Sequence, residues 1–583
     1  MEQHHTTRTP PAQKVRFAGK AARDLLAGRL DEVTFPESHG WEKVKENASR
    51  TVYRGSIEGQ DIYLKQFRSR TALHRIGRSL GISDALGELH FLQHLTQSGV
   101  PTPPPLAACC VNGTEWLATA AVAPCTPADQ WHAQQLEQGE QGRRAIRRAT
   151  RQLGQLVGRM HKAGVIHEDL HCGNVLVRTD TNPPTMVLTD LHRARHRRWL
   201  TRRSRAKNLA QLFHDRQSFT SRTDRLRFLK AYLRAAEARG SLRGWQLLVE
   251  YFAARHTRGQ HAQRDRRIVG NNRYFSRISL PGGWKGHVVL ASKRCLAGSR
   301  AAKDTFTPGQ WKDLLADPET LFTGDDVESR KDTPSGLLVR RTLTIGDRQY
   351  GVYIKRPRRK RAWKILPDCL RPARAIRAFR QGHQLLTRRI PTALPLAAIE
   401  RRVGPLLLDN ILITEEVEGR SLHEFLSTHL SNRPGRPVQL DSHQKRILAR
   451  DTLWQLGRLV QKLHDSNFAH RDLKATNILV HWRKGSVPEL VLIDLDGLRS
   501  WRHVPIRRRW QGIMRLNVSL LNCPTVNHAG RLRMLLGYLR RPGSGRINFK
   551  PWWRMLEDWS AQKLRRQIRS RRRRQRAARR PSS

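Results

Sequence analysis

The chain has 583 residues, with 108 Lys and Arg against 49 Asp and Glu, so its formal net charge is +59. A hydrophobic content of 38% is too high for a disordered chain. No window approaches the ~18 apolar residues of a membrane span, the N-terminus lacks the apolar core of a secretory signal, and seven cysteines without a CxxC pair argue against a disulfide scaffold or a zinc site. We expect a soluble, cytoplasmic protein with an anionic partner, which composition leaves open as nucleic acid, an anionic membrane surface or a phosphorylated substrate.

The first predicted elements, roughly residues 41–68, are antiparallel strands with Gly-containing turns. QDIYLKQF places Lys65 at the end of an alternating strand. Lys65 is the only lysine between Lys45 and Lys162 in a chain that otherwise uses arginine, which indicates that a compact ammonium matters there. Glu88 follows on a predicted helix (LGELHFLQHL) and is placed to orient Lys65 by an ion pair.

A helical stripe over 143–163 leads into a polar loop, MHKAGVIHEDLHCGNVLV, at 160–177. This loop carries Asp169 and Asn174. Two short apolar strands follow at 175–177 and 186–188, and the second runs into MVLTDLHRAR, which contains Asp190.

The same order of elements recurs later in the chain. Strands over roughly 336–356 contain Lys355 in YGVYIKRP, and a second helical stripe leads into LHDSNFAHRDLKATNILV at 463–480. Both loops read H-x5-H-x-D-L-x3-N, with equivalent histidines 303 residues apart. The later aspartates, Asp190 and Asp494, follow the loop aspartates Asp169 and Asp472 by 21 and 22 residues. This agreement predicts a duplicated domain.

Each copy is predicted to be an α+β unit in which a strand-rich small lobe precedes a mainly helical large lobe. We expect units at 31–256 and 301–560, an N-terminal segment at 1–30, a linker or lead-in at 257–300, and a basic disordered tail at 561–583.

The residue types suit phosphoryl transfer, which must hold a Mg-nucleotide, orient a hydroxyl and neutralise charge on the moving group. Asp169 and Asp472 are the candidate catalytic residues, because a loop carboxylate accepts or aligns the hydroxyl proton. Amide and carboxylate oxygens are the hard ligands that Mg prefers. The predicted metal ligands are therefore Asn174, Asp190, Asn477 and Asp494.

The order Lys, Glu, H-x-D-x4-N, Asp resembles the protein-kinase-like fold, and H-R-D-L-K-x-x-N of the second copy is the closer match. Both copies together look most similar to the lipopolysaccharide kinases of Gram-negative bacteria, which phosphorylate the inner-core sugars Kdo or heptose. The similarity lies in HEDLHCGN, in DLHRAR after Asp190, and in the elements GVPTP and RIPT, and it covers roughly 41–250 and 330–540.

The resemblance implies two tandem bilobal kinase-like domains and an ATP- and Mg-dependent transfer of phosphate to a sugar hydroxyl of the lipopolysaccharide inner core. It implies ATP-binding roles for Lys65, Glu88, Lys355 and Lys474. The partners would be a lipopolysaccharide core or another anionic glycolipid, and the anionic inner face of the cytoplasmic membrane, where the protein would be peripheral.

The second copy departs from this pattern. Nothing aligns with Glu88 in the helix that precedes Pro391, so Lys355 needs another orienting partner, such as His383, or the copy is impaired. Neither copy has a G-x-G-x-x-G loop, and no A-P-E anchor follows the later aspartates, which counts against a regulated protein kinase.

Basic clusters lie next to the candidate sites. The segment 192–207 has eight Lys or Arg and no acid, arginines and Trp501 follow Asp494, and a third cluster covers 355–364. These clusters favour an anionic acceptor or an anionic bilayer; the alternative is a solvated basic face. The segment 563–580 adds 11 basic residues.

Three alternatives remain open from the sequence. The chain could be a eukaryotic-like protein kinase, one or both copies could be inactive pseudokinases, or a dead kinase fold could serve as a scaffold with a polyanion-binding surface. The last predicts steeply salt-dependent binding of nucleic acid without ATP turnover. Nucleic acid is the less favoured partner, because the clusters adjoin the two candidate sites.

Overall fold

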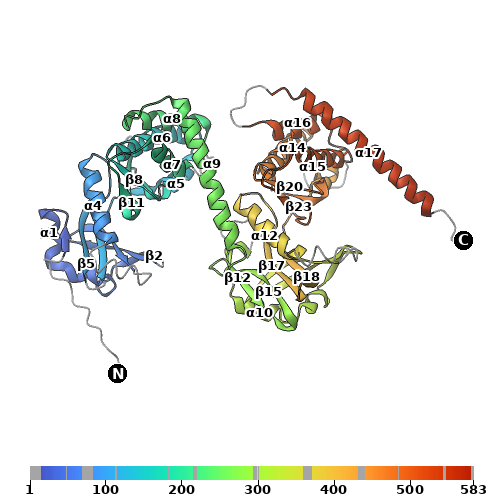
Figure 1. Ribbon diagram of the computed structural model, residues 1–583, viewed down its shortest axis with the longest axis horizontal. Coiled ribbons are helices and arrows are strands. Elements are labelled where there is room, and N and C mark those ends of the chain that lie inside the picture. The colour runs from blue at the N-terminus through green and yellow to red at the C-terminus, as the bar shows by residue number, and fades with distance from the viewer. Residues whose placement is uncertain are drawn as a thin grey trace. The chain divides into compact units, whose positions relative to one another are not determined.

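The structure is a computed structural model that describes residues 15–47, 49–68, 83–111, 114–181, 184–213, 220–292, 299, 301–358, 371–430, 440–483, 485–541 and 547–578. The chain divides into two compact units, Met1–Gly259 (unit 1) and Gln260–Ser583 (unit 2). Each unit has a β-sheet followed by a mainly helical part, so the predicted α+β architecture of tandem kinase-like domains is confirmed (Figure 1).

The small lobe of unit 1 is a six-stranded antiparallel sheet in the order β1-β5-β6-β4-β3-β2. Its strands are β1 (Val15–Phe17), β2 (Glu42–Asn47), β3 (Arg50–Ile57), β4 (Gln60–Phe67), β5 (Pro105–Val111) and β6 (Thr114–Ala120). The helices of this lobe are α1 (Lys20–Leu26), α2 (Leu30–Thr34) and α4 (Asp84–Gln97). Helix α4 packs on β5 and β6, and the Ser83 hydroxyl caps it by accepting a hydrogen bond from Leu86 N at 3.1 Å.

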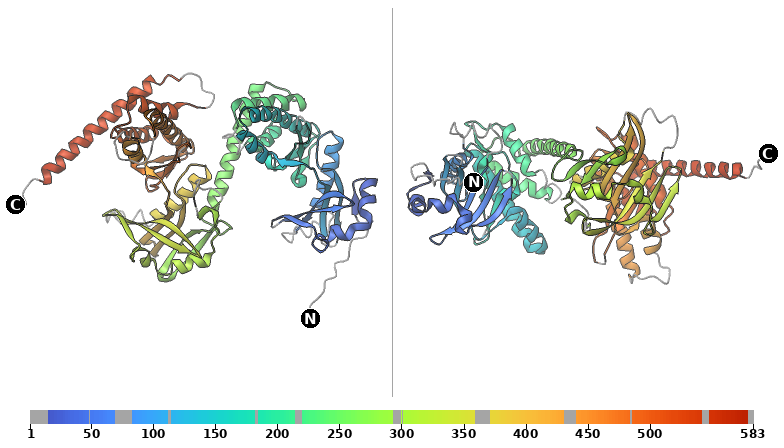
Figure 2. Two further views of the ribbon diagram at one scale, coloured as in Figure 1. Left: turned by 180° about the vertical axis from the view of Figure 1, so that it is seen from behind. Right: turned by 90° about the horizontal axis from the view of Figure 1, so that it is seen from below.

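The large lobe of unit 1 is built around α6 (Gly139–Lys162), which packs along α8 (Arg222–Ala235). Its other helices are α5 (Ala128–Glu137), α7 (Arg202–Phe213) and the part of α9 (Leu242–Arg267) up to Gly259. Short strands pair as β10-β9-β7 and β11-β8, with bounds β7 (Cys125–Pro127), β8 (Val165–His167), β9 (Val175–Arg178), β10 (Thr185–Leu188) and β11 (Ala194–His196). These strands fix the two ends of the predicted polar loop. Figure 2 shows the sheet in blue and the helices in cyan to green from two further directions.

The small lobe of unit 2 is a seven-stranded antiparallel sheet in the order β12-β13-β17-β18-β16-β15-β14. Its strands are β12 (Phe275–Ser279), β13 (Trp284–Val289), β14 (Glu328–Thr333), β15 (Gly336–Ile345), β16 (Arg348–Pro357), β17 (Pro395–Val403) and β18 (Leu406–Glu415). Helix α10 (Pro308–Leu314) contacts β12 and β15, and α12 (Arg374–Thr387) packs on β17 and β18. Hydrophobic side chains of the sheet and of α10, such as Ile354 and Trp311, form a core of their own.

The large lobe of unit 2 repeats the plan of the first. Helix α14 (Ser442–Asp465) packs along α16 (His528–Leu539), and α15 (Ile506–Leu520) packs on α17 (Lys550–Ala578). Between the lobes lie β19 (Arg420–Ser421) and α13 (Leu422–Glu424), and the short strands of the loop are β20 (Phe468–His470), β21 (Ile478–His481), β22 (Glu489–Leu492) and β23 (Leu498–Ser500). A capping box between Asp441 and Gln444 starts α14.

The boundaries differ from the sequence-based ones. Residues within the predicted N-terminal segment 1–30 contribute β1, which pairs with β5, and the buried Leu26. The stretch 257–300, expected to be a linker or lead-in, supplies β12 and β13 of the second sheet, because β13 pairs with β17. The predicted disordered tail lies largely within α17, whose Arg, Gln and Ala residues are good helix formers.

None of the helices in the described part of the chain is long and apolar enough to cross a membrane.

Candidate active site

The two polar loops have the same internal geometry. In unit 1, the backbone N–H of Asp169 donates to His167 Nδ1 at 3.2 Å, and His167 Nε2 donates to the Thr189 carbonyl at 3.1 Å. In unit 2, Asp472 N donates to His470 Nδ1 at 3.1 Å, and His470 Nε2 donates to the Asp494 carbonyl at 2.5 Å. Both histidines therefore brace the loop, since neither ring nitrogen is left for proton transfer.

The two asparagines close each loop. Asn174 Nδ2 donates to the Asp169 carbonyl at 3.0 Å, and Asn477 Nδ2 donates to the Asp472 carbonyl at 2.9 Å. Because the amide nitrogen is used in this way, the amide oxygen is the atom that each asparagine offers to a cation. The predicted catalytic and metal-binding residues of each loop are thus brought together.

In unit 1 the predicted lysine, glutamate and second aspartate meet. Lys65 Nζ lies 2.5 Å from Glu88 Oε1 and 3.7 Å from Asp190 Oδ1. The same Glu88 oxygen accepts the backbone N–H of Leu191 at 3.0 Å, so the buried glutamate ties α4 to the residue after Asp190. The expected ion pair between Lys65 and Glu88 is present.

Arg50, at the start of β3, adds a contact that the sequence did not indicate. Its Nη1 and Nη2 atoms donate to the two Asp190 oxygens at 2.5 Å each, and His192 Nδ1 lies 2.7 Å from Oδ1. Burial alone would raise the pKa of Asp190, but the hydrogen bonds from His192 and Arg50 and the charge of Lys65 hold that pKa well below its usual range. Asp190 is therefore ionised, and both of its carboxylate oxygens accept hydrogen bonds from Arg50.

In unit 2, the carboxylates that pair with the strand lysine come from the loop after β22 and not from a helix. Lys355 Nζ lies 3.1 Å from Asp494 Oδ1 and 2.7 Å from Asp496 Oδ2. Burial opposes ionisation of Asp494, but the charge of Lys355 and its hydrogen bond keep the pKa of Asp494 below its usual value. Counting back from Val100–Pro101 and Ile390–Pro391, the position of Glu88 is held by the buried Ala378.

His383 does not orient Lys355, so that expectation is wrong. Its Nε2 donates to the Pro395 carbonyl at 2.9 Å, and its ring packs edge-on against Phe275 and Phe379 with centroids 4.7 and 4.6 Å away. Burial lowers the pKa of His383 to about 3, so it is neutral in the folded chain. His383 is therefore part of the packing of α12. The negative charge that Lys355 needs comes from Asp496 instead.

Lys474, the predicted ATP ligand of the second loop, pairs with the candidate catalytic residue. Lys474 Nζ lies 2.8 Å from Asp472 Oδ2, and both side chains are about half exposed. The corresponding residue of unit 1, His171, lies farther from its aspartate, with Nε2 4.0 Å from Asp169 Oδ2. The second loop thus presents a carboxylate and an ammonium together.

Sequence reasoning missed Arg50 and Asp496 for different reasons. Asp496 had a signal, since LIDLDG repeats an aspartate two residues after Asp494. Arg50 had none, because its contact with Asp190 joins residues 140 positions apart and depends on the register of a hairpin.

A group of arginines surrounds the loop of unit 2. Burial and the neighbouring guanidinium groups of Arg471 and Arg508 lower the pKa values of Arg499 and Arg515, while Asp472 acts in the opposite direction on Arg515. A cluster of partly buried guanidinium groups of this kind favours binding of an anion. The predicted cluster at 355–364 lies mostly outside the described residues.

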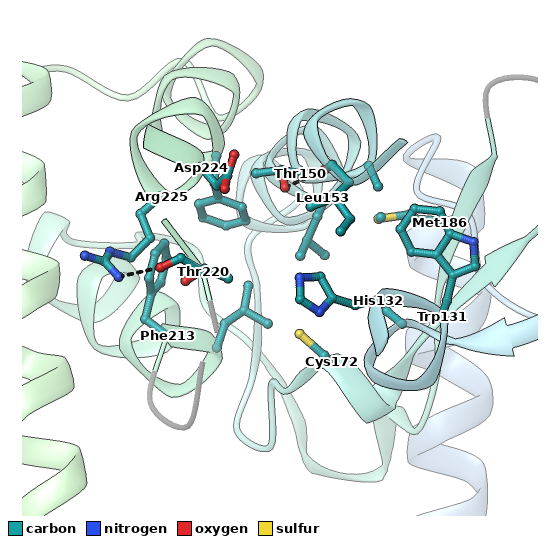
Figure 3. A pocket seen from close by; sticks show the side chains of 15 residues that line it. Trp131, His132, Thr150, Leu153, Cys172, Met186, Phe213, Thr220, Asp224 and Arg225 are labelled. Atoms are coloured by element: carbon teal, nitrogen blue, oxygen red, sulfur yellow. Dashed lines mark hydrogen bonds between the residues drawn. The ribbon is translucent and has the colours of Figure 1, made fainter. Parts of the chain in front are cut away.

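An apolar cavity of about 100 Å³ lies in the helical part of unit 1 (Figure 3). Its lining includes Trp131, Leu153, Met186 and Phe213, with Cys172 from the polar loop at one side. The described residues that line it include none of the predicted catalytic, nucleotide or metal residues, so this cavity is separate from the candidate site.

The two units differ in how well they suit a magnesium ion. In unit 2, Asp494 and Asp496 share one ammonium as far as the described residues go, and Asn477 adds an amide oxygen; such hard oxygen donors fit Mg. In unit 1, both oxygens of Asp190 accept hydrogen bonds from Arg50. The donor set of unit 2 fits the cation. In unit 1, Glu88, Asp190 and His192 each bring one possible ligand atom within 4.8 Å of the others, but Arg50 and Lys65 already pair with the two carboxylates.

One family model matches both halves of the chain. The sequence model of the Lipopolysaccharide kinase (Kdo/WaaP) family matches residues 39–232 and 333–531. The lipopolysaccharide core heptose(I) kinase WaaP of Pseudomonas aeruginosa is 26% identical over 204 residues, covering 33% of this chain and 76% of that protein. A 3-deoxy-D-manno-octulosonic acid kinase of Haemophilus influenzae is 30% identical over 131 residues, covering 22% of this chain and 50% of its own length.

A solved structure of WaaP in complex with acyl carrier protein matches 41% of this chain and 98% of that chain, with 24% identity and a TM-score of 0.33.

Proposed function

Since the chain belongs to the lipopolysaccharide kinase (Kdo/WaaP) family, with two matching regions, we propose that it is an ATP- and Mg-dependent kinase that transfers phosphate to a sugar hydroxyl of the lipopolysaccharide inner core. The observation that carries this proposal is the group around Lys355, in which the strand lysine meets the carboxylates of Asp494 and Asp496, while His470 links the backbone of Asp494 to that of the loop aspartate Asp472. Phosphoryl transfer requires this combination of charges.

Each residue of unit 2 has a task in this reaction. Asp472 aligns the acceptor hydroxyl and takes its proton, and Lys474, at 2.8 Å from Asp472, places a positive charge beside the oxygen that attacks. Lys355 binds the nucleotide phosphates. Asn477 and Asp494 would hold the magnesium ion, which when bound neutralises charge on those phosphates.

The arginines beside Asp472 support an anionic acceptor. Arg471 precedes Asp472 in the chain, and Arg515 interacts with the Asp472 carboxylate. Burial, together with repulsion from Arg471 and Arg508, lowers the pKa values of Arg499 and Arg515. A phosphorylated or carboxylated sugar would relieve this repulsion. This favours an inner-core glycolipid over a neutral sugar as the acceptor.

The charge of the chain supports a peripheral position on the inner face of the cytoplasmic membrane. Helix α17 presents exposed Arg565, Arg566 and Arg569, and the segment 563–580 carries 11 basic residues. Each basic residue near an anionic bilayer contributes about 1 kcal/mol to binding.

Incubation of the full chain with radiolabelled ATP, Mg and purified core glycolipids tests the proposal. We expect label in the glycolipid, located by mass spectrometry, and its loss by a factor of at least ~100 in Asp472→Ala, as for removal of a general base. Asp451→Asn, which changes an exposed aspartate paired only with its neighbour Arg450 among the described residues, is the control. Nucleotide binding without transfer to any core acceptor would refute the proposal, and label in a protein substrate instead would favour a protein kinase.

A further inference from the structure

In each unit, a hairpin lies beside the strand that carries the lysine. Its second strand begins at Arg50 in unit 1 (β2–β3) and at Gly336 in unit 2 (β14–β15). Arg50 pairs with Phe67 in unit 1, and Gly336 pairs with Pro357 in unit 2. Phe67 and Pro357 each lie two residues after the strand lysine, Lys65 or Lys355. Gly336 is therefore the counterpart of Arg50.

The hairpins themselves match. Arg68 N donates to the Ser49 carbonyl at 2.8 Å, and Arg358 N donates to the Ser335 carbonyl at 3.2 Å. The backbone is thus held in the same way in both units, and the guanidinium is an added group in unit 1. Unit 2 excludes a side chain here, because a Cβ on Gly336 would lie 2.9 Å from the Arg356 carbonyl oxygen and the residue has φ of +154°.

The added arginine changes the charge of the site. In unit 1, the carboxylates of Asp190 and Glu88 face the cations Arg50 and Lys65, so their charges cancel. In the described part of unit 2, Asp494 and Asp496 face Lys355 alone, which leaves one negative charge. A divalent cation is attracted to the second arrangement and gains little from the first.

Burial strengthens the contact in unit 1. The Arg50 and Asp190 side chains are 12% and 15% exposed, against 30% and 32% for Lys355 and Asp494. The pair is also bidentate, with two parallel N–H···O bonds of 2.5 Å. Such a pair is among the strongest that side chains form, and a cation could reach Asp190 only by displacing it.

We infer that the Arg50 guanidinium occupies the position on Asp190 that a divalent cation would take, so that unit 1 does not bind Mg-nucleotide and the magnesium-dependent transfer belongs to unit 2. This inference rests on the proposed function, because it assigns that function to one of the two units.

Counting metal–nucleotide sites on the full chain tests the inference without relying on activity. Mn²⁺ serves as the probe for Mg²⁺, together with a non-hydrolysable ATP analogue, in equilibrium dialysis followed by electron paramagnetic resonance. We expect one Mn²⁺–nucleotide site per wild-type chain, one in Asp190→Asn and none in Asp494→Asn. Two sites in the wild type, or loss of the site in Asp190→Asn, would overturn the inference.

Removing the guanidinium gives the second test. In Arg50→Ala we expect the count to rise from one site to two. The control is Arg54→Ala, on the same strand, whose exposed guanidinium pairs with Asp61 at 2.7 Å; its count should stay at one. If Arg50→Ala has the circular dichroism and melting temperature of a folded chain and still shows one site or none, Arg50 does not close unit 1 and the inference fails.

The outcomes also separate this inference from the proposed function. No Mn²⁺–nucleotide site on the wild-type chain would refute both. One or two sites that persist in Asp190→Asn and in Asp494→Asn would refute the assignment of the metal ligands in both units. Two sites, each lost with its own aspartate, would leave the proposed function standing and refute only the inactivity of unit 1.

Discussion

At the level of single residues, the two units pair their strand lysine with carboxylates from different residues. A partly buried ammonium needs a carboxylate close by, because desolvation otherwise disfavours its charged form. In unit 1 the carboxylate of Glu88 comes from α4, and in unit 2 the carboxylate of Asp496 comes from the loop after β22. Ala378 at the helix position leaves room for this exchange.

Asp496 should therefore be a positioning residue for Lys355. In Asp496→Asn the ammonium loses a charge-assisted hydrogen bond worth about 1.5–3 kcal/mol, so kcat/KM for ATP should fall by roughly ten- to a hundredfold. The effect should appear chiefly in KM for ATP, because Lys355 binds the phosphates in the ground state as well. Steady-state kinetics over a range of ATP concentrations measures it. An unchanged KM would show that Lys355 does not depend on Asp496.

At the level of elements, each large lobe depends on a close crossing of two helices. Gly154 in α6 and Gly457 in α14 occupy equivalent positions, and a Cβ on either would clash with a backbone carbonyl of the partner helix, Phe228 O at 2.5 Å or Met534 O at 2.1 Å. Close approach of this kind admits only glycine. The crossing holds the helix that leads into each polar loop.

Gly154→Ala should destabilise unit 1 by about 1–3 kcal/mol, because the added methyl group overpacks the contact between α6 and α8. The matched control is Gly87→Ala in α4, where a Cβ meets nothing within 4 Å; there the better helix former should stabilise by up to about 1 kcal/mol. Urea unfolding of both variants measures the difference. Equal free energies of unfolding for the two variants would show that α6 and α8 can move apart to admit the methyl group without loss of stability.

Buried histidines in α6, α12 and α14 make stability depend on pH. Burial lowers the pKa of His161 to about 4 and the pKa values of His383 and His464 to about 3. Since these rings take up protons near pH 6.5 in the unfolded chain, the unfolded state binds more protons below that pH. The free energy of unfolding should fall by about 1.4 kcal/mol per pH unit for each histidine as the pH drops from 6.5 toward 4.

Urea unfolding of the wild type at pH 7.5 and at pH 5.5 measures this loss. His464→Gln provides the comparison, because it removes one of the buried rings, and its stability should fall less steeply over the same interval. Stability that does not change between pH 7.5 and 5.5 would contradict the neutral, buried state of these histidines.

At the level of the whole molecule, the net charge of +59 indicates partners less by its size than by where the basic residues lie. Arginines gather beside the loop of unit 2, and in unit 1 Arg50 pairs with the Asp190 carboxylate. A further group lies on α17, where Arg565, Arg566 and Arg569 are exposed. The first group suits an anionic acceptor and the last an anionic surface.

Replacing five basic residues of α17 by Gln should weaken binding to anionic vesicles, because each contributes about 1 kcal/mol near the bilayer. The variant changes Lys563, Arg565, Arg566, Arg569 and Arg572. Its control has the same net charge and changes Arg143, Arg144, Arg147, Arg148 and Arg151 of α6. Co-sedimentation with phosphatidylglycerol vesicles, and with phosphatidylcholine vesicles as the neutral case, measures binding. Equal loss in the two variants would indicate a non-specific effect of net charge.

Much of the fold and the loop residues could be predicted from the sequence. The strands around Lys65 and Lys355, the helices α6 and α14 and the two loops follow from local periodicity and from spacings that occur twice. These features depend on residues near one another in the chain. For the same reason, the spacing correctly predicted that Asp169 and Asn174 lie in one loop and that Asp472 and Asn477 lie in another.

The amino-acid sequence by itself determined that the chain carries two kinase-like units, because motif spacing is a local property and both copies preserve it. Only the tertiary structure decided which charges meet: Arg50 with Asp190, Lys355 with Asp496, and His383 with a backbone carbonyl instead of a lysine. Those partners come from separate strands, helices and loops, and strand register and helix packing bring them within a few ångströms of each other. The sites of the two units therefore differ although their motifs agree.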